Sequence, residues 1–139
     1  GAASSAVLGT IHGDGADAVF ERVVTDLGVP ASSFAATDFL VTLSTGERRA
    51  VASVEEVRDA GDGVAFESLF EPATDGAEAT GVIDRGNSRL VASLARPGES
   101  YADVLGVLDD RASLLADLAR TDRTDPTAVD AAHRERVGE

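Results

Sequence analysis

The spacing of apolar and polar residues divides the first third of the chain into one strand and two helices. Residues 7–11 (VLGTI) form an apolar run, which is typical of a short strand buried on both faces. A helix is predicted over residues 14–27, because apolar side chains recur there at helical spacing. A second, short helix is expected to start near Pro30, and a strand should follow it.

Three strands are predicted in the middle of the chain, over residues 38–44, 48–54 and 64–70. Turns rich in glycine separate them, so we expect an antiparallel meander. Residues 72–81 have the composition of a loop.

The rest of the chain is predicted to be helical, over residues 88–96, 100–120 and from 126 onward. Ser100 and Asp103 have the spacing of a capping box, and Asp125-Pro126 is a cap followed by a proline suited to the first helical position. We therefore expect an α/β chain, with an α+β-like order of strand, two helices, three-stranded meander and three helices. Residues 1–86 should carry the sheet, and residues 87–139 should form a helical appendage.

The composition narrows the classes of protein that fit. The 139 residues contain no cysteine, which excludes a disulfide framework, a thiol nucleophile and a thiolate metal site. The net charge is −13, and all twelve basic residues are arginine. Such a surface is typical of a halophilic cytosol, where the Debye length is only about 3 Å at 1 M salt. An ordinary acidic protein remains the alternative. Nonspecific nucleic-acid binding is disfavoured, and no apolar run reaches the roughly 18 residues of a membrane span.

The candidate chemistry lies at His12, which directly follows the first apolar run. The next six residues, GDGADA, match the pattern G-x-G-x-x-A of a dinucleotide-binding turn between a strand and a helix. Asp14 and Asp17 argue against that reading, because they place negative charge where a pyrophosphate would bind. A metal site is also disfavoured, since the other histidine, His133, lies far along the chain among charged residues. From the residues alone, a packing role for His12 stays open.

Several segments resemble one known family. SAVLGTIHGDGADAVFERV resembles the histidine box of the archaeal secretion ATPases, the motor family of type II secretion, type IV pili and the archaellum. DLGVPASSFAATDFLVTL and GERRAVASVEEV are similar to the segments that follow this box, the second to a strand with paired arginines that ends in Glu-Val. NSRLVASLA and YADVLGVLDDRASLLADL resemble the C-terminal region of the family.

The resemblance implies the distal part of a RecA-like motor domain in a hexameric ring ATPase. In the family, the histidine of the box faces the γ-phosphate region and couples hydrolysis to movement; His12 and Thr10 occupy the matching positions. The phosphate-binding loop, the Walker B acid that holds magnesium, and the arginines that reach the neighbouring ATP all precede this box. The resemblance thus implies ATP and Mg²⁺ as cofactors of the intact enzyme, none held by this chain, and no ATP hydrolysis by the chain in isolation.

The resemblance also implies partners and a location. The partners would be the upstream remainder of the ATPase, the neighbouring subunits of the ring and an integral-membrane platform protein. The motor would be cytoplasmic, at the inner face of the cell membrane, without inserting into it and without nucleic acid. Two alternatives stay open: a non-enzymatic interaction module derived from the ATPase, and an independent dinucleotide-binding domain that uses GDGADA.

The charge composition generates a prediction about salt. Raising KCl from about 0.1 M to about 3 M should raise the melting temperature by several degrees, because repulsion among the acidic side chains is screened. Thermal unfolding followed by circular dichroism measures the trend. A melting temperature that stays constant or falls across the series would contradict the halophilic interpretation.

Overall fold

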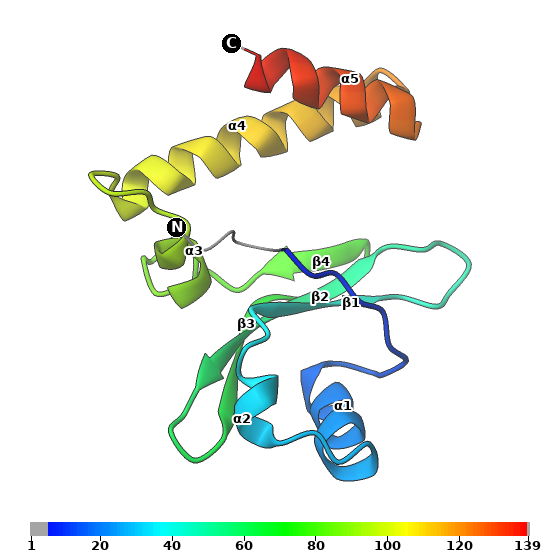
Figure 1. Cartoon of the computed structure of the whole chain (residues 1–139). Coiled ribbons are helices and arrows are strands. Elements are labelled where there is room, and N and C mark those ends of the chain that lie inside the picture. Colours follow the sequence, from blue (N-terminus) through cyan, green and yellow to red (C-terminus); the bar gives the residue numbers. More distant parts are fainter. Residues whose placement is uncertain (1–5, 139) are drawn as a thin grey trace. The chain divides into compact units, whose positions relative to one another are not determined.

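The structure is a computed structural model that describes residues 6–138. Within these residues it is a mixed α/β chain with a four-stranded antiparallel sheet and both short and long helices (Figure 1). The chain forms two compact units, one ending at Leu90 and the other beginning at Val91. Each unit is described by itself.

The first unit begins with helical segments. These are α1 (Ala16–Phe20), the π-helical η1 (Glu21–Asp26) and α2 (Ala31–Phe34). The helix predicted over residues 14–27 is confirmed in position, but its second half has π-helical hydrogen bonding that the apolar spacing did not reveal. The short helix after Pro30 is confirmed as α2.

The sheet is a meander whose strands lie side by side in chain order. The strands are β1 (Phe39–Leu43), β2 (Val51–Asp59), β3 (Val64–Ala73) and β4 (Gly76–Ala79). The antiparallel meander is confirmed, but it has four strands instead of three. The loop predicted over residues 72–81 is wrong, because β4 pairs there with the end of β3, including Pro72. A proline and several small residues are tolerated in a short strand pair at a sheet edge.

The predicted strand over residues 7–11 is absent. These residues have no regular secondary structure, and the side chains of Val7 and Leu8 are 92% and 98% exposed. A strand needs a neighbour to bond its backbone N–H and C=O groups. No strand among the described residues pairs with this segment, so its apolar composition alone does not make it a strand.

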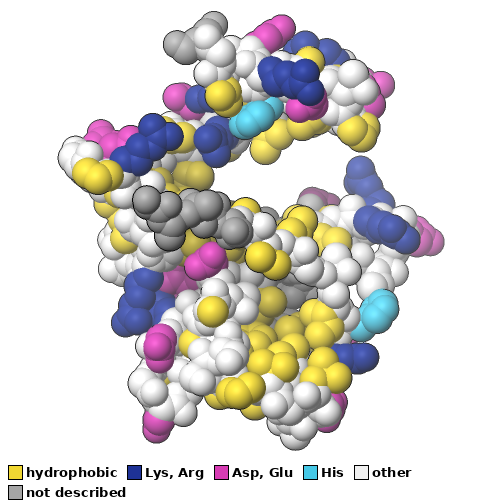
Figure 2. Space-filling view, viewed as in Figure 1, with side chains coloured by type: hydrophobic (Ala, Val, Ile, Leu, Met, Phe, Trp, Pro, Cys, Tyr) yellow, Lys and Arg dark blue, Asp and Glu magenta, His cyan; other side chains and the backbone are white. Residues whose placement is uncertain are grey.

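The helices of the first unit pack on one face of the sheet. Phe20, Phe34 and Phe66 meet edge to face, with ring centroids 5.2–6.2 Å apart. This geometry suits the aromatic quadrupole and adds to the burial of the three rings. Figure 2 shows apolar side chains gathered where α1 and α2 meet the sheet. This aromatic cluster joins the helices to β3.

A β-bulge lies in the middle of the sheet. Val54 pairs with Phe70 and Glu55 pairs with Ser68, so Leu69 is an extra residue on β3. Leu69 is buried. A bulge of this kind bends a strand and redirects neighbouring side chains. It lies beside the adjacent glutamates Glu55 and Glu56 of β2, whose side chains point to opposite faces of the sheet.

Three helices follow the sheet: α3 (Arg89–Ser93), α4 (Tyr101–Arg120) and α5 (Pro126–Val137). The caps predicted for α4 and α5 are confirmed: Ser100 and Asp103 form a reciprocal capping box, and the Asp125 carboxylate accepts the amide of Ala128. The helix predicted over residues 88–96 is shorter than expected, since α3 ends at Ser93. None of the helices in the described part of the chain is both long and apolar enough to cross a membrane.

Candidate functional site

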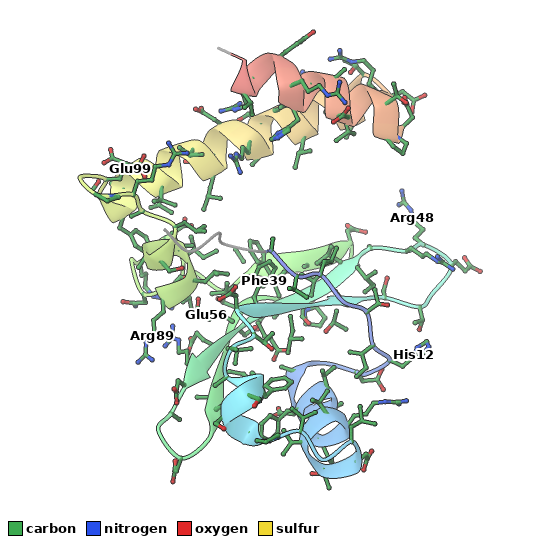
Figure 3. The ribbon with its side chains drawn as sticks, viewed as in Figure 1. His12, Phe39, Arg48, Glu56, Arg89 and Glu99 are labelled. Atoms are coloured by element: carbon green, nitrogen blue, oxygen red, sulfur yellow. The ribbon has the colours of Figure 1, made fainter. Side chains whose placement is uncertain are left out.

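The structure places Thr10 and His12 in the irregular segment before α1. Both side chains are exposed, and with Ile11 they line a small hollow of about 130 Å³. This volume is well below the roughly 300–1,000 Å³ of typical ligand pockets. The sequence placed His12 at the end of a strand, at a sheet edge, and that placement is wrong because the strand is absent. Figure 3 shows His12 at the periphery of the first unit.

The GDGADA turn already holds an anion of the chain itself. Gly15 has φ 111°, a conformation that favours glycine, and the amide of Ala16 at the start of α1 donates to Glu55 Oε2 at 2.8 Å. A pyrophosphate on this helix would need the same amide. Asp17 adds a second negative charge in the first turn. The local geometry therefore offers no support for dinucleotide binding.

The most densely bonded side chain of the first unit is Glu56 of β2, which is 1% exposed. Its carboxylate accepts three hydrogen bonds from the start of α3 (Figure 3). The Ser88 hydroxyl donates at 2.6 Å, the Arg89 amide at 3.0 Å and the Leu90 amide at 3.1 Å. A carboxylate from the sheet thus caps a helix that lies more than thirty residues later in the sequence.

Arg58 completes the surroundings of this carboxylate. Its Nε lies 2.8 Å from Glu56 Oε1, and its Nη2 lies 2.5 Å from the same oxygen. The guanidinium also donates to the Asn87 carbonyl at 2.8 Å, just before α3, and lies 3.7 Å from the half-exposed carboxylate of Glu67. The buried negative charge therefore has both a counterion and hydrogen bonds, as such a charge requires.

Two opposing effects set the pKa of Glu56. Burial raises the pKa, while the hydrogen bonds from Ser88, Arg58 and the Leu90 and Arg89 amides lower it. The hydrogen bonds together prevail, so the pKa of Glu56 lies below its ordinary value. A carboxylate whose pKa is lower in the folded than in the unfolded state stabilises the fold fully above the unfolded pKa. That contribution is lost as the pH falls through the folded pKa.

The two neighbouring glutamates of β2 thus accept amides at the starts of two helices, Glu55 at α1 and Glu56 at α3. Neither glutamate was predicted as a site residue from the sequence. The predicted strand ended at residue 54, before both acids, and the structure shows that β2 includes them and that α1 starts after Gly15 without a capping side chain of its own. The sequence also does not name the partners, because each contact spans more than thirty residues.

A larger hollow of about 400 Å³ lies on the sheet near the first residues of β2 and β4. Its lining residues are Ala50, Val51, Val54, Phe70, Asp75, Gly76 and Ala77. The lining is mostly apolar and its charged member is an acid, so it does not suit the phosphates of a nucleotide.

The arrangement has a structural rather than a catalytic character. The Glu56 carboxylate is fully engaged, and a general base needs a lone pair directed at a substrate. No group of three or more potential metal ligands occurs among residues 6–138. No protein-family model, curated protein or solved structure matches the chain.

The geometry predicts that substitution of Glu56 destabilises the protein far more than substitution of Glu67, although both carboxylates face Arg58. Glu56→Gln should lower the free energy of unfolding by about 3 kcal/mol, because it leaves Arg58 and the α3 amides without their anion. Glu67→Gln, the matched control at the exposed end of the same arginine, should cost less than about 1 kcal/mol. Urea unfolding at neutral pH and constant KCl measures both.

The pH dependence provides a second readout of the same pair. The gap between wild type and Glu56→Gln should be constant above about pH 4.3, the ordinary glutamate pKa, and should narrow below it. Equal costs for the two variants at neutral pH would contradict the assignment of Glu56 as the buried anion.

Proposed function

We propose that this chain is the C-terminal segment of the motor domain of a halophilic archaeal secretion or pilus ATPase. The intact protein would be a hexameric RecA-like motor that couples ATP hydrolysis to protein export or filament assembly. The observation that carries this proposal is the apolar edge of the sheet at β1, with which no strand among residues 6–138 pairs.

The backbone of β1 is ready for a further neighbour. The Asp38 carbonyl accepts from Val57 and the Ser44 amide donates to Ala50, so these alternate positions face β2. In an antiparallel pair, every second residue directs its backbone groups to the same side. Phe39, Val41 and Leu43 therefore present their N–H and C=O groups to the open edge.

The side chains of β1 are equally unsuited to a free edge. Phe39, Val41 and Leu43 are 47%, 46% and 60% exposed, and β1 contains no charged residue and no proline. Charges and prolines protect natural edge strands from further pairing, and β1 has neither; its register with β2 shifts between Thr42 and Leu43, where the extra residue lies on β2. A strand that is apolar on both faces is typical of the interior of a sheet. The sequence of β1 thus supports a sheet that continues beyond it.

Residues 7–11 support the same conclusion from the other end of the first unit. Val7, Leu8 and Ile11 are exposed, although their composition suits a buried strand. A helical connection separates this segment from β1, which is the order of a β-α-β unit in a parallel sheet. A strand-like segment without a strand neighbour and a strand with one edge unpaired among residues 6–138 fit a piece of a larger α/β domain, as a RecA-like motor domain would provide.

The role proposed for Thr10 and His12 follows from this arrangement. If residues 7–11 become a strand in the intact domain, Thr10 and His12 lie at its carboxyl end, where α/β folds bind ligands. Phosphoryl transfer depends mainly on positioning and charge neutralisation by loop amides, lysine, magnesium and arginine. A single histidine adds one hydrogen bond to this set, so His12 is proposed to couple the nucleotide state to movement.

The partners follow from the same proposal. The upstream remainder of the ATPase would complete the sheet and supply the ATP and Mg²⁺ sites, and neighbouring subunits would close the ring. An integral-membrane platform protein would receive the motion at the inner face of the cell membrane.

A second function also has an observation in its favour. An open apolar strand edge can bind an extended peptide through β-augmentation, as interaction modules do. A protein of this class would use the β1 edge without any ATP turnover.

Substitution of His12 in the intact protein tests the proposed function. His12→Ala should lower ATP turnover by about tenfold or more, while ATP affinity and the melting temperature stay nearly unchanged, because the lost interaction acts on the hydrolytic step. His133→Ala replaces the other histidine of the chain, which is exposed in α5, and should leave turnover unchanged.

Steady-state ATPase assays and nucleotide titrations compare turnover and ATP affinity in the wild type, His12→Ala and His133→Ala. Full turnover in His12→Ala would refute the coupling role. An intact protein that hydrolyses no ATP but binds a partner peptide would favour the interaction module.

A further inference from the structure

We propose that Glu56 is a latch that holds the first turn of α3 on the sheet, and that α3 can open locally while the four-stranded sheet stays folded. This device is independent of the proposed ATPase function, because it involves only contacts within this chain.

The helix α3 depends on contacts outside itself. It has five residues, and an isolated helix of that length is unstable in water because nucleation is costly. Its first amides, those of Arg89 and Leu90, donate to the Glu56 carboxylate. The carbonyl of Asn87, just before the helix, accepts from Arg58, the counterion of Glu56. The Glu56–Arg58 ion pair of β2 therefore bonds to three backbone groups at the start of α3, those of Asn87, Arg89 and Leu90.

The sheet is also stabilised by contacts that do not involve α3. The aromatic cluster of Phe20, Phe34 and Phe66 packs the helices of the first unit on the face opposite Glu56. β2 and β3 are the two longest strands and pair with each other from Asp59 and Val64 to the bulge and beyond. The α3 segment has further contacts, since Ser88 and Val91 are buried, but a short helix outside the paired strands opens at lower free energy than the sheet core. Local release of α3 without loss of the sheet is the expected order of events.

Opening of α3 would lengthen the segment that joins the two units. The division between the two compact units falls within α3, between Leu90 and Val91. A helix rises 1.5 Å per residue and an extended chain rises about 3.3 Å, so opening five residues lengthens the connection by about 9 Å. The latch would therefore control the reach of the segment that joins the second unit to the first.

Hydrogen exchange followed by mass spectrometry tests the latch on the whole chain. In Glu56→Gln, amides of residues 88–94 should exchange about tenfold faster or more than in wild type, which corresponds to at least about 1.4 kcal/mol of local opening. Over the same labelling times, peptides from β2, β3 and α4 should stay largely protected in Glu56→Gln, because the sheet remains folded when residues 88–94 open. Glu67→Gln, the control that faces the same arginine from the exposed side, should exchange within about twofold of wild type throughout.

Ser88→Ala covers the case in which Glu56→Gln unfolds the first unit as a whole. It removes one donor to the carboxylate and keeps the charge, so exchange over residues 88–94 should rise about threefold while the sheet is unaffected. Unchanged exchange over residues 88–94 in Glu56→Gln would overturn the latch. If Glu56→Gln exchanges faster everywhere, Ser88→Ala decides: a rise confined to residues 88–94 supports the latch, and no rise or a uniform rise refutes it.

Discussion

The first unit depends on the hydrogen bonds that two adjacent carboxylates of β2 accept from helix N-termini. Glu55 and Glu56 point to opposite faces of the sheet, and each carboxylate accepts backbone amides from the start of a helix, α1 on one face and α3 on the other. Helix N-termini carry free N–H groups and a partial positive charge, so they are favourable partners for a carboxylate. For Glu56, burial would be costly without these donors and Arg58.

This interaction explains the local details around it. Gly15 takes a positive φ where the Ala16 amide reaches Glu55, and the bulge at Leu69 lies next to the glutamate pair. The aromatic cluster packs the helices of the first unit on their face of the sheet, while the Glu56 carboxylate holds the segment leading into α3 on the other. β1 lies outside this system of contacts, and no strand among residues 6–138 pairs with its second edge.

The sequence predicted the features that local spacing determines. Ser100 with Asp103 and Asp125 with Pro126 act within one helical turn, and both caps are found in the structure. The strand predicted over residues 7–11 is absent, because a strand requires a neighbouring strand that composition does not reveal. The strand β4 was missed because its small residues have the composition of a loop. Glu56 was missed because its partners lie more than thirty residues away. The coupling role of His12 rests on the resemblance, and it remains a prediction.

An NMR titration of the whole chain tests the capping of α3 by Glu56 most directly. The side-chain carboxyl resonance of Glu56 would be followed with the amide protons of Arg89 and Leu90 as the pH is lowered. We expect the Arg89 and Leu90 amides to shift together with Glu56, at a pKa below the ordinary glutamate value. Arg89 and Leu90 amides that do not shift with Glu56, or a Glu56 pKa at or above the ordinary glutamate value, would contradict the capping of α3 by Glu56.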